Sequence, residues 1–338
     1  MRHDRALAVM QGGEPQQRYA IGDATMVGEA RRAAQYLAQG AQLDATSVGR
    51  VGIVVTELAS NLVRHAGSGE IFLQVVRSIE GSPQLEILSL DSGPGMADIE
   101  RCLSDGFSTA GTPGTGLGAV RRLSVLFDLF STGGKGCVVV SRIGLGRPGL
   151  FGAVCTPVRG ETACGDCWRL AQKEGESSAI VLDGLGHGVS AATASQAGAQ
   201  AFAEAPFDGP GVVIERVHQR LAGTRGAAGA CLQRTLDGRL RFAGIGNIGA
   251  RAFGADSSQG LTSHNGILGV QIRRLQQFDY DGRLQPLLIM HSDGVSARWE
   301  LDQYPGLRMR HPAVIAGVLY REHRRERDDA TILVVGHE

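Results

Sequence analysis

The first half of the chain alternates between segments with helical spacing and segments with strand-like spacing of apolar residues. Apolar residues recur at helical spacing over residues 25–39 and again over residues 47–65. Strand-like apolar runs lie on either side of these helices, at residues 18–22, 71–76, 85–90 and 137–143. A cluster of glycine and proline at residues 144–149 then interrupts the pattern, so we place a domain boundary near Gly146.

After this boundary, short strand-like runs dominate the pattern. They occur at residues 151–157, 168–171, 179–182, 229–234, 240–245, 287–291 and 331–335. Helical spacing separates them at residues 191–203, 212–221 and 312–322. Strands and helices in this order are most simply arranged as two packed sheets flanked by helices. The pattern therefore predicts an α+β chain with two domains, residues 1–146 and residues 147–338.

Charge and composition exclude several classes of protein. Lysine plus arginine and aspartate plus glutamate each total 34, and this balance argues against a nucleic-acid or anionic-membrane binder, which carries a basic excess. Residues 1–18 lack the apolar core of a secretory signal, and no apolar run approaches the roughly 20 residues of a membrane span. The six cysteines show no disulfide-scaffold spacing, so we expect a cytoplasmic protein. Cys164 and Cys167 form a CxxC pair, which leaves a redox or zinc site as an alternative.

Three segments of the first domain carry residues suited to a nucleotide. Glu57 and Asn61 are four residues apart in a predicted helix and so share one face. The side-chain carbonyl oxygen of Asn61 suits Mg2+ as a ligand, and Glu57 could orient or deprotonate an attacking nucleophile. Asp91 directly follows a predicted strand and could accept a hydrogen bond from an exocyclic amine, while Gly93 and Gly95 allow the backbone to approach a flat base.

The third segment is a glycine-rich turn that opens a predicted helix. Backbone N–H groups at such a helix start, together with the helix dipole, suit phosphate oxygens. The residues of the turn are Gly114, Thr115, Gly116, Leu117 and Gly118. Each segment alone is a weak signal, but the three in this order predict a site for ATP with Mg2+.

These segments resemble the N, G1 and G2 boxes of the GHKL fold, the ATP-binding fold of gyrase, histidine kinases and MutL. The likeness covers residues 15–143 and is greatest to the small serine kinases of anti-sigma-factor and stressosome switches, to which residues 104–109 are also similar. The resemblance implies a two-layer α/β sandwich that binds ATP with Mg2+ and phosphorylates serine or threonine of a partner. At Gly136-Cys137 this chain departs from the resemblance, because many relatives have Gly-Thr there. Cysteine lacks the threonine hydroxyl, so we expect weaker recognition of the base.

In the second domain, aspartates recur at the ends of predicted strands. They are Asp166, Asp183, Asp293 and the pair Asp328-Asp329. A carboxylate beside an apolar strand is costly to bury unless a metal or hydrogen bonds compensate it. Converging carboxylates would hold two divalent ions, which can activate a water and bind phosphoryl oxygens. The alternative for any single Asp-Gly pair is a turn.

The same pattern resembles the sporulation and stress-response branch of the metal-dependent PPM-type serine/threonine phosphatases. The likeness covers residues 150–336, through Gly-Asp, Asp-Gly-x-Gly-His-Gly, Ser-Asp-Gly and Asp-Asp-x-Thr. It implies an α-β-β-α sandwich with two Mn2+ or Mg2+ ions. Asp183 would bridge both ions, the Gly184 carbonyl would bind one, and the remaining ligands would be Asp166, Asp293 and Asp328. Asp329 would support the ligands, Asn247 would have a supporting role, and His187 is either a general acid or a structural hydrogen-bonding residue.

The resemblances together predict a bifunctional bacterial signalling switch. The second domain would dephosphorylate phosphoserine or phosphothreonine on a partner, with Asp183 and Asp293 in the catalytic centre. The first, with Glu57 as its catalytic residue, would phosphorylate an anti-sigma antagonist or stressosome-type protein. We expect no nucleic-acid or membrane partner, and self-association is left open. The alternatives are a phosphatase whose first domain only senses nucleotide or binds a partner, and an interaction protein with two inactive sites.

Overall fold

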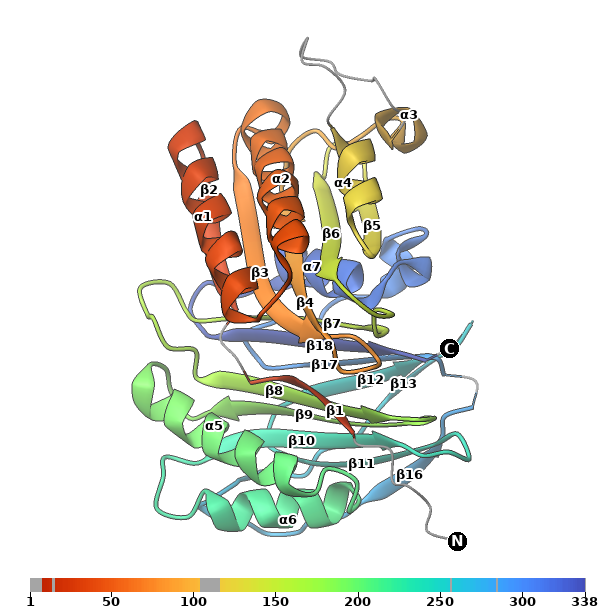
Figure 1. Ribbon diagram of the computed structural model, residues 1–338. Coiled ribbons are helices and arrows are strands. Elements are labelled where there is room, and N and C mark those ends of the chain that lie inside the picture. The colour runs from red at the N-terminus through yellow and green to blue at the C-terminus, as the bar shows by residue number, and fades with distance from the viewer. Residues whose placement is uncertain (1–7, 14–15, 104–115, 256, 284, 338) are drawn as a thin grey trace, which may run out of the picture. The chain divides into compact units, whose positions relative to one another are not determined.

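The computed structural model describes residues 8–13, 16–103, 116–255, 257–283 and 285–337. These residues form two compact units (Figure 1). The N-terminal unit comprises Gln16–Gly149 and Leu301–Arg321. The C-terminal unit comprises Met1–Pro15, Leu150–Glu300 and Glu322–Glu338. No helix in the described ranges is long and apolar enough to cross a membrane.

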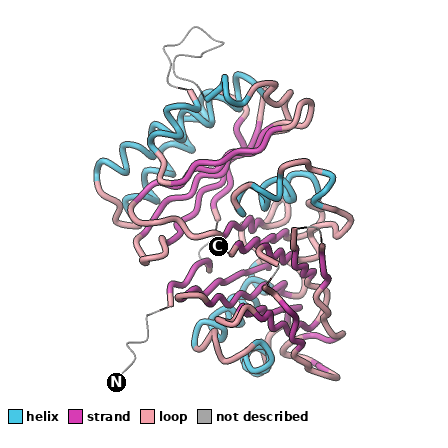
Figure 2. The backbone as a smooth tube through the Cα atoms, turned by 90° about the vertical axis from the view of Figure 1, so that its right-hand side faces the viewer, coloured by secondary structure: helices cyan, strands magenta, loops and turns pink. Residues whose placement is uncertain are grey.

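One antiparallel sheet forms the centre of the N-terminal unit, with strand order β2-β3-β4-β6-β5. Its strands are β2 (Gln17–Ile21), β3 (Gly69–Arg77), β4 (Pro83–Leu90), β5 (Leu126–Ser131) and β6 (Cys137–Gly144). Helices cover one face of this sheet (Figures 1 and 2). They are α1 (Ala24–Gly40), α2 (Ala45–Asn61), α3 (Ile99–Leu103) and α4 (Leu117–Leu123). The two-layer α/β sandwich predicted for this part of the chain is thus confirmed.

Local sequence explains where the two long helices begin and which face they bury. The Asp23 carboxylate accepts hydrogen bonds from the first backbone N–H groups of α1, and Asp44 does the same for α2. The buried face of α2 consists of the residues that repeat at helical spacing, Val51, Val54, Val55 and Leu58. After Asn61, α2 continues as one turn of π-helix, Leu62–Ala66. Such turns often occur at functional sites.

The opposite face of the same sheet is covered by α7 (Pro312–His323), whose residues up to Arg321 belong to this unit. Side chains alternate across a strand, so Ile71 and Leu73 of β3 join the core beneath α1 and α2 while Phe72 points to the other face. There its ring meets the Tyr320 ring edge to face, with centroids 5.5 Å apart. Gly317 of α7 lies against Val138 and Leu88 of the sheet, so α7 packs on this face.

The C-terminal unit contains two antiparallel sheets. The six-stranded sheet has the order β1-β8-β9-β10-β11-β16, and the five-stranded sheet has the order β13-β12-β17-β18-β7. Two helices, α5 (Val189–Glu204) and α6 (Pro210–Arg220), pack on the six-stranded sheet through a core that includes Leu182 and Phe202. A two-stranded hairpin, β14-β15, completes the unit.

In the C-terminal unit, β7 to β11, β17 and β18 coincide with the predicted runs, whereas β1 and β12 to β16 were not predicted. The strands are β1 (Val9–Gly12), β7 (Phe151–Thr156), β8 (Asp166–Lys173), β9 (Glu176–Gly184), β10 (Ala227–Arg234), β11 (Arg239–Ile245), β12 (Gly249–Phe253), β13 (Ser258–Gly260), β14 (Gly266–Ile267), β15 (Gln271–Ile272), β16 (Phe278–Asp281), β17 (Leu287–His291) and β18 (Ala330–Gly336). Two short 3-10 turns, Leu301–Gln303 and Leu307–Met309, lie in the N-terminal unit.

The division between the units differs from a single cut near Gly146. The main chain passes from one unit to the other between Gly149 and Leu150, close to the predicted position. However, β1 pairs with β8 of the C-terminal unit, and α7 packs on the sheet of the N-terminal unit. Each unit therefore includes one segment from the far end of the chain. A division at one position cannot represent this exchange.

Candidate functional site

A cavity of about 400 Å³ opens in the N-terminal unit between α2 and the loop that follows β4. All three predicted segments contribute to its lining. The predicted residues that line it are Glu57, Asn61, Asp91, Gly95, Gly116 and Leu117. The fold thus brings together residues that are up to 60 positions apart in sequence, as the nucleotide-site prediction requires.

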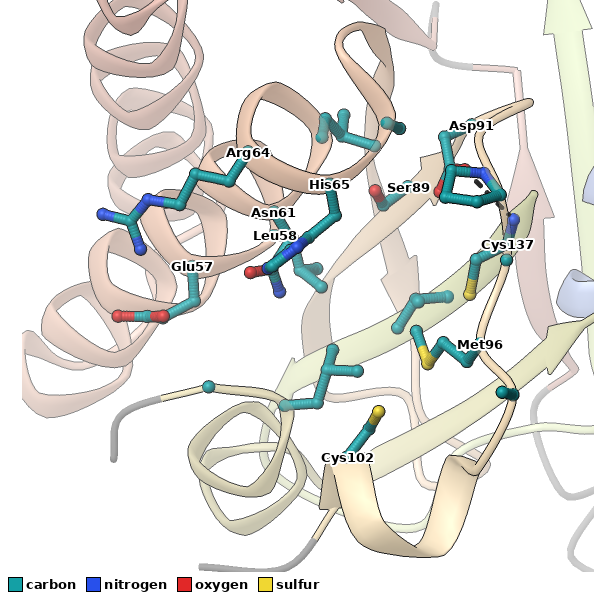
Figure 3. A pocket seen from close by; sticks show the side chains of 18 of the residues that line it. Glu57, Leu58, Asn61, Arg64, His65, Ser89, Asp91, Met96, Cys102 and Cys137 are labelled. Carbon is teal, nitrogen blue, oxygen red and sulfur yellow. Dashed lines mark hydrogen bonds between the residues drawn. The ribbon is translucent and has the colours of Figure 1, made fainter. Parts of the chain in front are cut away.

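One wall of the cavity is polar and comes from α2 and the π-helical turn after it. Figure 3 shows Glu57, Asn61 and His65 along this wall, with the Asn61 side chain between the other two. The spacing of four residues places these side chains one above another on a single helix face. The wall therefore offers a carboxylate, a carboxamide and an imidazole to a ligand.

The facing wall contains Asp91, the residue expected to recognise a base. Its Oδ1 accepts hydrogen bonds from the backbone N–H groups of Gly93, at 2.9 Å, and Cys137, at 3.3 Å. Burial raises the pKa of Asp91 above its ordinary value, while these two hydrogen bonds act in the opposite direction. The carboxylate is thus fixed in orientation at the cavity wall, with Gly93 acting through its backbone.

Apolar and sulfur-containing side chains complete this wall. Met96, Cys102 and Cys137 line the cavity opposite the polar face of α2 (Figure 3). Burial raises the pKa of the Cys137 thiol to about 12, so the thiol is neutral near pH 7. A flat ligand can therefore lie between the polar face of α2 and these soft, uncharged side chains, with the Asp91 carboxylate on the same wall as the latter.

Part of the glycine-rich turn falls outside the described residues. Gly114 and Thr115 belong to that part, and the run 104–109, which also resembles the switch kinases, lies outside the described residues as well. Gly116 precedes α4 as its N-cap, and Leu117 and Gly118 are buried in the first turn of this helix. The structure therefore describes only the last three residues of the predicted phosphate-binding turn, at the start of α4.

In the C-terminal unit, Asp166 and Asp183 are direct partners in the β8–β9 ladder. Asp166 is 4% exposed, and its Oδ2 accepts a hydrogen bond of 2.6 Å from the Ser292 hydroxyl. Burial, followed by the charge of Asp183, raises the pKa of Asp166 well above its ordinary range. Burial, followed by the charges of Asp293 and Asp328, raises the pKa of Asp183 to about 7. Two adjacent carboxylates of raised pKa form the centre of an acidic cluster.

Asp293 extends this cluster from the end of β17. Its Oδ2 accepts a 2.6 Å hydrogen bond from the Asn247 amide. Burial, then the negative charge of Asp328 and a hydrogen bond with it, raises the pKa of Asp293. Asn247 thus holds one carboxylate of the cluster through a hydrogen bond.

The neighbouring aspartates before β18 make different contacts. Asp329 is 2% exposed, and its two oxygens accept backbone N–H hydrogen bonds from Val158, at 2.7 Å, and Gly165, at 2.8 Å. Asp328 instead lies near Asp183 and Asp293, whose pKa values it raises. The contacts therefore assign Asp329 to holding two loops together and Asp328 to the acidic cluster.

The donor set of this cluster fits hard divalent cations. It consists of carboxylate oxygens, which Mn2+ and Mg2+ prefer. One of them, Asp166 Oδ1, is buried and has no hydrogen-bond partner among the described residues, which leaves it available to a cation. Within the described ranges, no three His, Cys, Asp or Glu side chains are already arranged to hold a metal ion. Two cluster oxygens, Asp166 Oδ2 and Asp293 Oδ2, accept hydrogen bonds from Ser292 and Asn247.

Two further predictions concern the turn after β9. Gly184 ends that strand and donates its N–H to the Gly165 carbonyl at 3.1 Å. His187 is exposed, and its Nδ1 lies 2.8 Å from Glu161 Oε1. The position of His187 is therefore fixed by a hydrogen bond to Glu161, which connects it to the loop before β8.

The CxxC pair does not form a joined thiol site. Cys167 is buried, and burial raises its pKa to about 12. Cys164 instead contacts Cys155, with their sulfurs 3.7 Å apart. All six cysteines are free thiols. The geometry therefore gives no support to a zinc site built on Cys164 and Cys167.

Sequence reasoning missed two residues that contact the candidate sites. Ser292 was noted only as part of a motif, yet it binds Asp166 and also accepts from the Thr331 backbone N–H at 3.0 Å. Arg321 had no signal at all, yet its guanidinium donates to the Asp91 backbone carbonyl at 2.8 Å. A bond to a backbone carbonyl leaves no trace in the sequence, so only the structure could identify it.

Comparison with known proteins agrees with the fold of the N-terminal unit. Residues 22–142 match the model of a family described as "Histidine kinase-like ATPase domain". Over 87 residues, 26% of this chain, the chain is 41% identical to the serine/threonine-protein kinase RsbT of Bacillus subtilis (strain 168). The match spans 65% of that kinase's length, slightly less than two thirds.

Solved structures also resemble this chain. A structure described as "The bacterial stressosome: a modular system that has been adapted to control secondary messenger signaling" aligns with a TM-score of 0.51 and 26% identity, over 54% of this chain and 97% of that one. A crystal structure of RsbX in complex with magnesium aligns with a TM-score of 0.46 and 20% identity, over 54% of this chain and 92% of that one.

Proposed function

We propose that this chain is a bifunctional signalling switch that both removes and adds phosphate on serine or threonine of partner proteins. The acidic cluster would be the phosphatase centre, and the cavity beside Glu57 would bind ATP with Mg2+. The observation that carries the phosphatase assignment is the buried Asp166 Oδ1 without a partner, beside Asp183 in the same ladder. Buried carboxylates arranged in this way need a cation to be stable in their charged form.

In the phosphatase centre, Asp166, Asp183, Asp293 and Asp328 would hold two Mn2+ or Mg2+ ions, with the Gly184 carbonyl as a further ligand. Bound divalent ions would supply charge stabilisation for the phosphoryl group and acidify the attacking water. Ser292 and Asn247 hydrogen-bond Asp166 and Asp293, so each holds one carboxylate in place. Asp329 fixes the loops of Val158 and Gly165.

In the nucleotide site, Asp91 would accept a hydrogen bond from the exocyclic amine of adenine, with Gly93 and Gly95 allowing close approach. Asn61 would bind Mg2+ together with phosphate oxygens. Glu57 would orient the serine or threonine hydroxyl of the partner and take its proton. Gly114, Thr115, Gly116, Leu117 and Gly118 would bind phosphate through the backbone.

The partner would be an anti-sigma antagonist or a stressosome-type protein with a regulatory serine or threonine. Supporting this choice are the 41% identity to the kinase RsbT and the likeness to a stressosome structure. We place the protein in the cytoplasm. Because kinase and phosphatase acting together would consume ATP without net change, nucleotide state or partner binding would favour one activity at a time.

The first experiment measures Mn2+-dependent hydrolysis of an aryl phosphate by the wild type, Asp183→Asn and Asp293→Asn. We expect both variants to lose at least about 100-fold in kcat, because each loses a ligand of the ions that stabilise the transition state. Asp279→Asn serves as a matched control, since Asp279 is an exposed aspartate on β16 that forms a 3.6 Å ion pair with Arg241. Equal rates in all four proteins would reject the phosphatase assignment.

A second candidate function makes the N-terminal unit a nucleotide sensor that transfers no phosphate. The observation that favours it is Cys137, a buried neutral thiol beside Asp91 where related kinases often have threonine. ATP binding without transfer to any candidate partner, together with no effect of Glu57→Gln, would select the sensor.

A further inference from the structure

The helix α7 is attached to the N-terminal unit at both ends. At its start, Asp128 of β5 accepts hydrogen bonds from the Arg310 guanidinium, at 3.3 Å, and the His311 backbone N–H, at 2.6 Å. At its end, Arg321 donates to the Asp91 carbonyl at 2.8 Å. Between these ends α7 packs on the sheet through Tyr320, which meets Phe72, and Gly317, which lies against Val138. The part of α7 up to Arg321 is therefore packed into this unit.

The contact at the end of α7 involves the residue that would recognise the base. The Asp91 carboxylate lies at the cavity wall, while the Asp91 carbonyl oxygen binds Arg321. Asp91 is also bonded through its N–H to the Cys137 carbonyl, at 3.0 Å. A ligand that shifts or fixes the Asp91 backbone therefore acts directly on the hydrogen bond that holds the end of α7.

The chain that leaves α7 runs directly beside the acidic cluster. Within the C-terminal unit, the His323 carbonyl accepts from the Ser296 N–H at 2.9 Å, and the Arg325 N–H donates to the Gly294 carbonyl at 2.7 Å. Residues 294–296 immediately follow Asp293, and Asp328 comes three residues after Arg325. A movement of the α7 end thus reaches Asp293 and Asp328 through a few covalently connected residues.

Gly294 shows how close these segments are. A Cβ placed at Gly294 would lie 1.7 Å from the carbonyl oxygen of Asp329. The backbone after Asp293 therefore packs directly on the backbone of the Asp328-Asp329 pair. A displacement of either segment must displace the other, because close-packed backbones do not adjust independently.

We propose that nucleotide bound beside Asp91 controls the acidic cluster through Arg321 and α7, so that ATP or ADP is an allosteric ligand of the phosphatase. This proposal rests on the proposed function of both sites. Nucleotide binding alters the backbone at Asp91, Arg321 transmits the change to the end of α7, and residues 323–325 pass it to the segments that carry Asp293 and Asp328. Arg321 is a positioning residue, since it would act through the Asp91 backbone carbonyl to which it donates.

The test measures kcat/KM for an aryl phosphate with Mn2+, in the presence and absence of ADP at a concentration shown to saturate by calorimetry. ADP cannot donate a γ-phosphate, so the kinase reaction does not interfere. We expect ADP to change the wild-type kcat/KM by about fivefold or more in either direction, the usual size of allosteric coupling. Asp91→Asn at the same ADP concentration controls for chelation of Mn2+.

The variant Arg321→Met keeps an aliphatic side chain and removes the donor to Asp91. We expect it to bind ADP but to lose the change in kcat/KM. Arg310→Met is the matched control, because it also removes an arginine, from the segment that precedes α7, at the end away from Asp91. We expect Arg310→Met to respond to ADP as the wild type does.

The outcomes separate this inference from the proposed function. Wild-type protein that binds ADP and hydrolyses phosphate with a change below fivefold would overturn the coupling and leave both sites intact. An undiminished response in Arg321→Met would overturn the route through α7. Absence of ADP binding would reject the nucleotide site itself. Hydrogen exchange of residues 323–329 in the wild type gives a measurement without variants: ADP should change it, and an unchanged rate contradicts the proposal.

Discussion

Asp166 and Asp183 lie opposite each other in the β8–β9 ladder, and both carboxyl groups hold their protons more tightly than an ordinary aspartate. Burial is the main cause at both residues, and neighbouring carboxylates add to it. The acidic cluster is thus costly for the fold when it is charged and carries no cation. The same cost makes it a good site for divalent ions, because binding removes the repulsion.

We expect the metal-free protein to become more stable as the pH falls from 8 to 5.5. The pKa of Asp183 is raised from 3.8 to about 7, so the folded state binds a proton that the unfolded state lacks within this window. The stabilisation is complete below about pH 3.8 and is lost as the pH rises through about 7. Thermal unfolding in a chelator measures the change, and Asp183→Asn should flatten it. If stability depends on pH equally in Asp183→Asn and in the wild type, Asp183 is not the group that causes the dependence.

The neighbouring aspartates should separate into a metal ligand and a structural residue. Asp328→Asn should abolish Mn2+-dependent hydrolysis with little loss of stability. Asp329→Asn should instead destabilise the fold by about 1–3 kcal/mol, because a buried backbone N–H of Val158 or Gly165 then faces an amide group that cannot accept at both positions. Urea unfolding and metal titration of both variants provide the comparison. Equal loss of stability in the two variants would contradict the assignment of Asp328 to the metal ions and Asp329 to the structure.

Helix α7 should be essential to the N-terminal unit. A Cβ at Gly317 would lie 2.8 Å from Val138 Cγ1, so Gly317→Val overpacks the face between α7 and the sheet and should cost about 1–3 kcal/mol of stability. Gly40→Ala at the end of α1 is a matched control, because no atom lies within 4 Å of its added Cβ. It should be neutral or slightly stabilising. Denaturant unfolding of both variants measures the change in stability. A Gly317→Val variant as stable as the wild type would contradict the packing of α7 on the sheet.

Much of the fold could be predicted because its signals are local. The apolar residues of α2 repeat at helical spacing, and the structure buries them. The pairing of Val9 with Gln172 and the packing of Phe72 on Tyr320 could not be predicted, since each joins residues more than 150 positions apart. Local spacing shows that a segment has an apolar face but not which sheet covers it.

In the candidate sites, too, only residues with a local sequence signal could be predicted. Asp183 and Asp293 could be found because they lie in short motifs that combine an acidic residue with glycine. The different contacts of Asp328 and Asp329 could not be derived, because adjacent identical residues carry no separate signal. The structure distinguishes them through the backbone N–H groups of Val158 and Gly165, which bind Asp329.

The two walls of the nucleotide cavity should have separable roles. Asp91→Asn should weaken ADP binding by about tenfold or more, because its amide cannot accept from both the ligand and the N–H groups of Gly93 and Cys137. Glu57→Gln should leave ADP affinity within about twofold and abolish phosphate transfer to a partner, since it removes only the proton acceptor.

Calorimetry with ADP gives the affinity, and transfer of labelled γ-phosphate to a stressosome-type protein gives the activity. Glu100→Gln is a suitable control, because Glu100 is an exposed acidic residue on α3 that does not line the cavity. If Glu57→Gln weakens ADP binding as strongly as Asp91→Asn does, Glu57 would be a ligand of the nucleotide and not a base for the partner hydroxyl. The cavity would then need another residue to accept that proton, and His65 on the same helical face would be the next to replace.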